Sequence, residues 1–180
     1  MYPTKMEANG HIYNINTDYR VAIACLKAID DDEISDFVRY LAVETLLLGT
    51  GVDNNDRNIL KNKIASYLRC GKEENTPDNE IDFDYIQDEE AVEVSIRQAY
   101  SIDLTKIDYM HWWEYNKLIS GLLPESLINR IRESRTIDET EYKDPKQRER
   151  IRKIKEFNAL KKKQRKLTDE ELKNMEDFYK

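Results

Sequence analysis

The chain of 180 residues is long enough for one domain with a substantial core, or for one domain with an appendage. Its charged residues (36%) are nearly as frequent as its hydrophobic ones (39%), but the apolar residues recur at helical spacing, which excludes wholesale disorder. Glycine and proline are few, which argues against a many-turned β fold, and no apolar run approaches the roughly 20 residues that would span a bilayer. The net charge of −7 argues against a dedicated nucleic-acid binder, and the first residues lack the apolar core of a secretory signal.

The first sixteen residues predict a β-hairpin. Asn9-Gly10 is a dipeptide that favours a tight type I′ turn, because both positions of that turn require a positive φ. It joins Lys5–Ala8 to His11–Ile15, which alternates apolar and polar residues. Since a two-stranded hairpin is not stable alone, we expect it to lie on the helices or to join the edge of another subunit.

Three helices are predicted next. The first begins at a cap on Thr17 or Asp18, the second covers about 34–48, and the third covers about 54–69 and is stopped by Gly71. The acidic run 30–33 is expected to start the second helix, where the helix dipole favours negative charge. Helical spacing predicts that the second helix buries Ile34, Phe37, Val38, Leu41 and Thr45.

An aromatic segment, Ala91–Leu123, is predicted to form the centre of the core. It contains Trp112 and Trp113 and reads as two helices joined by a short turn. Asp88 is expected to open the first helix, and the S/T-x-x-D spacing of Thr105 and Asp108 predicts a cap for the second. After this pair, Pro124 suits the first turn of another helix that ends near residue 135.

Two polar segments divide the chain. Residues 72–80 are polar and contain Pro77, which predicts a mobile loop and a division at 71–82; residues 136–144 form a second linker. We therefore expect a helical domain over 1–140 and a charged helical arm over 141–180. The predicted fold is mainly α: a compact helical bundle with a small N-terminal β-hairpin and a charged C-terminal helical arm.

The arm is the predicted partner-binding part of the protein. Asp144-Pro145 is a cap followed by proline at the first helical position, and a last helix is expected after Thr168. The arm is basic whereas residues 1–140 are acidic, which predicts either contact between the two or an acidic partner for the arm. A thin apolar seam could dock on its own domain or on a partner, and an aromatic face could be core or contact surface. The candidate partner-binding residues are Ile151, Ile154, Phe157, Arg148, Arg152, Lys155, Tyr109 and Tyr115.

The sequence contains no motif for catalysis, a cofactor or a metal. Its two histidines are isolated, and His111 is expected to be a core or rim residue rather than a general base. Cys25 and Cys70 lack a paired motif and are expected to be free thiols. We therefore expect a protein that is not an enzyme and has neither a cofactor nor a metal site.

Several runs carry a family resemblance: Ile15–Arg20 (INTDYR), Asp82–Asp84, Ile96–Leu104 (with the pattern IxxAYSIDL) and Met110–Tyr115 (MHWWEY). Through them, about residues 12–135 resemble the tail-assembly-chaperone-like family of siphophages and prophages of Gram-positive bacteria. The resemblance implies a virion-morphogenesis protein that binds the tape-measure protein and helps to recruit tail-tube subunits. It also implies a location in the cytoplasm of the infected or lysogenic host and absence from the mature virion. Whether the protein forms a homo-oligomer is left open.

The alternative function is a small phage regulatory or host-defence-interacting protein that binds nucleic acid. Its basis is the basic run Lys161–Lys166, which could neutralise several phosphates. Against it stand the acidity of the whole chain and the scarcity of aromatic residues in the arm.

Overall fold

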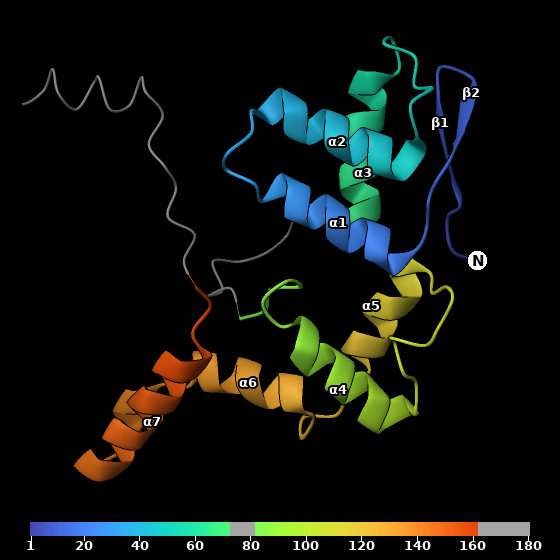
Figure 1. The fold of residues 1–180 in the computed structure, drawn as a ribbon. Coiled ribbons are helices and arrows are strands. Elements are labelled where there is room, and N and C mark those ends of the chain that lie inside the picture. Colours follow the sequence, from blue (N-terminus) through green and yellow to red (C-terminus); the bar gives the residue numbers. More distant parts are fainter. Residues whose placement is uncertain (73–81, 162–180) are drawn as a thin grey trace, which may run out of the picture.

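The computed structural model describes residues 1–72 and 82–161 (Figure 1). The chain starts with a β-hairpin that lies on helix α3 (Arg57–Leu68). Strands β1 (Lys5–Ala8) and β2 (His11–Asn14) are antiparallel, with Lys5 opposite Asn14. Asn9 and Gly10 both have positive φ, as the predicted turn requires. Met6 and Ala8 are buried. The hairpin prediction is confirmed, and the hairpin rests on its own helices.

Helices α1 (Tyr19–Ile29) and α2 (Asp36–Leu48) lie side by side (Figure 1). Asp18 caps α1 as expected, but Ser35 caps α2, so the acidic run 30–33 lies in the connecting turn. The predicted buried face of α2 is wrong, because Phe37, Val38 and Thr45 are exposed. The residues that α2 buries are Val43, Glu44 and Leu47.

The error has a physical cause in α2 itself, which carries apolar residues on both sides. Periodicity alone allows either side to be buried, and the positions of α1 and α3 decide between them. The chosen side includes Glu44, which sequence reasoning would place in solvent. Its burial is tolerated because the Arg57 Nε of α3 donates a hydrogen bond to Glu44 Oε1 at 3.1 Å.

The central segment forms α4 (Glu89–Tyr100) and α5 (Trp112–Ser120). Helix α5 begins later than the Thr105 cap predicts, because Asp103 holds Thr105 in a turn by accepting from its amide and its hydroxyl. His111 caps α5 instead: its Nδ1 accepts from the amide of Trp113 at 3.0 Å. The Nε2 of His111 must then carry the proton, and it donates to the carbonyl oxygen of Pro3 at 3.1 Å.

The two tryptophans join the halves of the core, as predicted for this segment. Trp112 is fully buried and its indole N–H donates to the carbonyl of Leu68 at 3.0 Å; the half-buried Trp113 donates to the carbonyl of Tyr67 at 3.0 Å. Both acceptors are at the end of α3. Gly71 follows with φ +73°, as expected of a helix stop, and a Cβ there would lie 3.2 Å from the Trp113 ring.

The last described elements are α6 (Leu127–Thr136), the short 3₁₀ helix η1 (Glu139–Glu141) and α7 (Pro145–Asn158). Ser126 caps α6, so Pro124 precedes the helix rather than entering its first turn. Asp144 caps α7 and Pro145 is its first residue, as predicted. Helix α7 packs on α6 and η1. The predicted loop after residue 72 lies mostly outside the described residues, and the last helix lies wholly outside them.

The mainly helical fold with a small hairpin is confirmed. In the described ranges, the helices are all too short or too polar to cross a membrane.

Candidate partner-binding surface of the C-terminal arm

Three basic residues of α7 contact the protein's own chain. Arg148 Nε donates to the carbonyl of Tyr142 at 2.6 Å, and Lys155 Nζ donates to the carbonyl of Ile137 at 3.0 Å. Arg152 Nε lies 3.1 Å from Glu139 Oε2. These residues were expected to meet a partner; here they hold the arm against the segment that precedes it.

The predicted apolar seam is split between two sides of α7. Ile151 is half-buried, whereas Ile154 is exposed and Phe157 is 88% exposed. The six residues from Ile151 to Phe157 turn the helix by about 600°, which leaves the two side chains about 120° apart around its axis, so they cannot share one narrow face. Ile154 and Phe157 instead lie in a shallow hollow that is also lined by Lys146, Glu149, Arg150 and Lys153.

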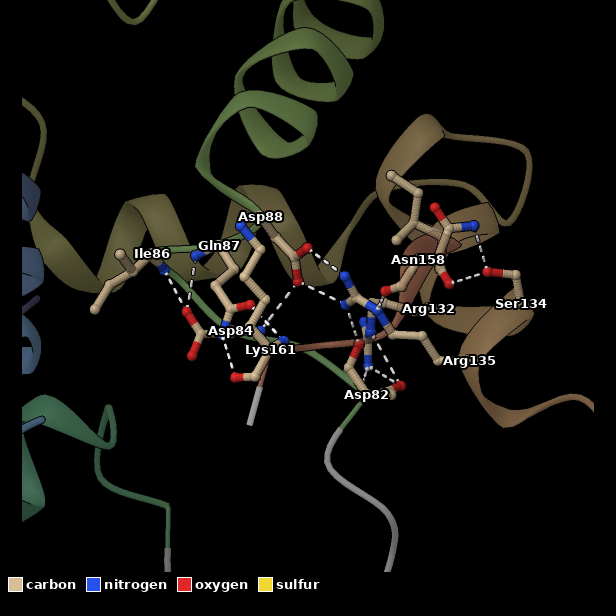
Figure 2. A network of polar contacts seen from close by, with 11 residues as sticks. Asp82, Asp84, Ile86, Gln87, Asp88, Arg132, Ser134, Arg135, Asn158 and Lys161 are labelled. Atoms are coloured by element: carbon tan, nitrogen blue, oxygen red, sulfur yellow. Dashed lines mark hydrogen bonds and ion pairs between the residues drawn. The ribbon is translucent and has the colours of Figure 1, made fainter. Parts of the chain in front are cut away.

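A buried ion pair fixes the end of α7 to the domain (Figure 2). Arg135 of α6 is 10% exposed and Asp88, just before α4, is 4% exposed. Arg135 Nη2 and Nη1 donate to the two carboxylate oxygens of Asp88 at 2.6 and 2.8 Å. Arg135 Nε donates to the carbonyl of Asn158 at 2.6 Å, and Nη1 also donates to the carbonyl of Asp82. One guanidinium therefore joins three parts of the chain.

Neighbouring contacts complete this network (Figure 2). The side-chain amide of Asn158 donates to Ser134 Oγ at 2.8 Å. Gln87 and the backbone of Lys161 exchange two hydrogen bonds, with Lys161 N to Gln87 Oε1 at 2.8 Å. Asp88 occupies the N-cap position of α4, as predicted, but its carboxylate makes no capping hydrogen bond. It accepts from Arg135 instead. Sequence reasoning missed the network because nothing local links residues almost fifty positions apart.

A groove lies between α4, α6 and the end of α7. Its apolar lining comes from Ala91 and Val94 of α4, Leu127 and Ile131 of α6, and Phe157 at its α7 end; Glu90, Arg135 and Lys161 are among its charged residues. Leu127 and Phe157 are exposed, whereas Ile128, which follows Leu127 in α6, is fully buried. The groove offers an apolar surface with charges of both signs around it.

The two candidate tyrosines are in different environments. Tyr115 is 1% exposed and its ring stacks on Tyr19 with centroids 4.6 Å apart; burial raises the pKa of its hydroxyl well above the usual value. It is therefore a core residue, which removes it from the candidate surface. Tyr109 is exposed, and its hydroxyl is 2.6 Å from Thr17 Oγ1. Tyr109 does not line the groove.

His11 belongs to a second polar cluster that sequence reasoning also missed. The buried carboxylate of Asp56, just before α3, accepts from Tyr13 at 2.6 Å and from Asn9 and His11 at 2.7 Å. The hydrogen bonds from Tyr13, His11 and Asn9 lower the pKa of Asp56, and the bond to Asp56 raises the pKa of His11. The cluster fastens the hairpin to α3.

The two cysteines do not form a disulfide with one another. Cys25 is buried, which raises the pKa of its thiol to about 12, and Cys70 is half-buried; both are free thiols. Within residues 1–72 and 82–161, no three histidine, cysteine or acidic side chains gather closely enough to hold a metal ion. The basic run after Lys161 lies outside the described residues.

The chain matches a known protein family. A family model described as "Bacteriophage Gp15 protein" matches residues 2–160, a range that includes every helix and strand described above. No curated protein and no solved structure matches the chain.

Proposed function

Because the chain belongs to the Bacteriophage Gp15 protein family, we propose that it is a non-enzymatic tail-assembly chaperone, which binds the tape-measure protein and helps to recruit tail-tube subunits. The sequence resemblance to tail-assembly-chaperone-like proteins supports this role. In this proposal the protein acts in the cytoplasm of the infected or lysogenic host and is absent from the mature virion.

The observation that carries the proposal is the groove between α4, α6 and α7. A tape-measure chain is long and helical, and before the tube encloses it, it exposes apolar helical stripes. An amphipathic helix binds by laying such a stripe into an apolar groove. Ala91, Val94, Leu127 and Ile131 form a surface of this kind, and Phe157 extends it.

The contact would have to be reversible, since the chaperone leaves the finished tail. The groove is short and its rim is charged, so one groove can cover only a short part of a partner helix. Weak contacts of this kind gain strength when many of them act along one repetitive chain. The Arg135 contacts keep the Phe157 end of the groove in place, which lowers the cost of ordering it on binding.

Copurification with the tape-measure protein tests the proposal. Leu127→Asp and Phe157→Ser change two exposed groove residues; Asp at the first position of α6 is favoured by the helix dipole, so the fold should persist. We expect the wild-type chain to retain the tape-measure protein and both variants to lose most of it. Leu123→Ser is the matched control, because Leu123 is also apolar and its exposure of 68% lies between those of Leu127 (41%) and Phe157 (88%), but it does not line the groove.

Two outcomes would contradict the proposal. If the wild-type chain retains neither tape-measure nor tube protein, the chaperone role is wrong. If it retains DNA or RNA that high salt removes, the nucleic-acid alternative is favoured instead.

A further inference from the structure

The shallow hollow on α7, which we call the α7 hollow, is uncovered. Its apolar residues are Ile154 and Phe157, 43% and 88% exposed, and its charged residues are Lys146, Glu149, Arg150 and Lys153. Lys153 pairs with Glu149 on the same helix at 2.8 Å, whereas the side chains of Lys146 and Arg150 make no hydrogen bond or ion pair within residues 1–72 and 82–161. The hollow is therefore basic toward the start of α7 and apolar toward its end.

The described part of the chain ends beside this hollow. Phe157 lines both the α7 hollow and the groove, and the lining of the groove also includes Lys161, the last described residue. Lys161 is held there by Gln87, whose side-chain oxygen accepts from the amide of Lys161 at 2.8 Å. A connection as long as 162–167 reaches about 20 Å when extended, and packed helices have axes only about 10 Å apart. The sequence from Thr168 onward is therefore within reach of the hollow.

The sequence of 168–180 complements the hollow in charge and in apolar pattern. After the capping box that begins at Thr168, Leu172, Met175 and Tyr179 follow at steps of three and four residues, which predicts one apolar stripe on a helix. The segment has five acidic and two basic residues, whereas three basic residues and one acidic residue line the hollow. Opposite net charge thus accompanies an apolar stripe that meets an apolar surface.

We propose that the α7 hollow is the docking site of this chain's own segment 168–180, which binds as a helix antiparallel to α7. The short connection requires that direction. Equal steps back along α7 match equal steps forward along the segment, so a register that sets Met175 opposite Ile154 also sets Leu172 opposite Phe157. The same register sets Tyr179 opposite Arg150, where an aromatic ring attracts a guanidinium.

The chain's own segment has an advantage over a separate partner. A short connection gives the segment an effective concentration of about a millimolar at the hollow, so a contact too weak to join two molecules can still form within one. Burial of Ile154 and Phe157 supplies the attraction. The opposite charges favour this segment over a basic one, although exposed ion pairs add little affinity themselves.

Hydrogen–deuterium exchange of the full chain, followed by mass spectrometry, tests the proposal. A helix as short as 168–180 is marginal alone in water, so protection of its amides reports docking. We expect these amides to exchange at least about tenfold faster in Ile154→Ser/Phe157→Ser than in the wild type. Both replaced side chains are exposed, so circular dichroism should show a folded domain. Leu123→Ser, an exposed apolar residue outside the hollow, should leave the exchange unchanged.

A change of charge tests the electrostatic part of the contact. Arg150→Glu should also speed the exchange of 168–180, whereas Arg130→Glu should not, because Arg130 is an exposed arginine of α6 that does not line the hollow. If the wild-type segment exchanges as fast as an unfolded chain, or if neither hollow variant speeds its exchange, the proposal is wrong.

Dilution shows whether the segment and the hollow belong to one molecule. An intramolecular contact does not depend on protein concentration, so the protection should be the same over about a hundredfold dilution. Protection that disappears on dilution would mean that a second copy supplies the segment, which overturns the proposal. Because no tape-measure protein is present, these results are independent of the test of the proposed function.

Discussion

Replacing Arg135 should destabilise the protein far more than replacing Arg132, one turn earlier on the same helix. Arg135→Ala removes two of the hydrogen bonds that the carboxylate of Asp88 accepts, and this carboxylate is only 4% exposed. Arg132 pairs with Asp82 at 3.1 Å, but both of those side chains are about one-third exposed. The two substitutions are identical in chemistry and differ in the burial of the pair that they break.

The magnitudes follow from that burial. Breaking a buried ion pair by removing one partner costs about 3–5 kcal/mol, because the other charge stays buried without compensation. Asp88 still accepts from the amide of Asp84, so we expect the lower end of that range, about 3 kcal/mol. An exposed pair such as Arg132 with Asp82 contributes about 0–1 kcal/mol.

Urea unfolding followed by the fluorescence of Trp112 and Trp113 measures both effects. The double variant Asp88→Asn/Arg135→Leu should lose less stability than the sum of its single variants, because the two residues form one interaction. If Arg135→Ala and Arg132→Ala agree within about 0.5 kcal/mol, the usual range for surface substitutions, the buried pair does not anchor α7 and this reasoning fails.

Three other predictions concern the core, the hairpin and the arm. Trp112→Ala should cost about 3–5 kcal/mol in urea unfolding and Trp113→Ala clearly less, because only Trp112 is fully buried; equal losses would contradict this. The bond to Asp56 raises the pKa of His11, so the stability that protonated His11 contributes should be complete below pH 6.5, the usual pKa of histidine, and should be lost as pH rises through the raised pKa. His11→Ala should therefore reduce the pH dependence of the melting temperature over that range. Deleting 144–180 removes the helical signal of α7 itself but should leave a folded domain that melts cooperatively, since α7 buries no residue. The deletion should also weaken copurification of the tape-measure protein. Loss of the cooperative melt would show that the arm is structural.

Local signals in the sequence predicted most elements of the fold. The Asn9-Gly10 turn, the Asp18 cap, the Gly71 stop and the Asp144-Pro145 start are all present where they were expected. Each of these depends on the backbone preferences of a few adjacent residues, so no distant part of the chain is needed to specify it. The same signals failed for α5, because His111 is an unusual cap and Asp103 holds Thr105 in a turn.

The candidate surface could be predicted only in part. The sequence correctly indicated a charged helix that starts at Asp144-Pro145, but it grouped Ile151, Ile154 and Phe157 into one seam and left open whether that seam docks on its own domain. The groove could not be predicted, because it depends on which sides of α4 and α6 the rest of the molecule leaves open.

The sequence by itself therefore determined which segments are helices and turns and where several of them begin or end, and that the tryptophan-rich segment belongs to the core. Only the tertiary structure decided which side of α2 is buried, that Arg135 pairs with Asp88, and that Arg148, Arg152 and Lys155 bind their own chain. The physical reason is range: capping and turn formation act over a few residues, whereas burial and ion pairing depend on segments that folding brings together from distant positions.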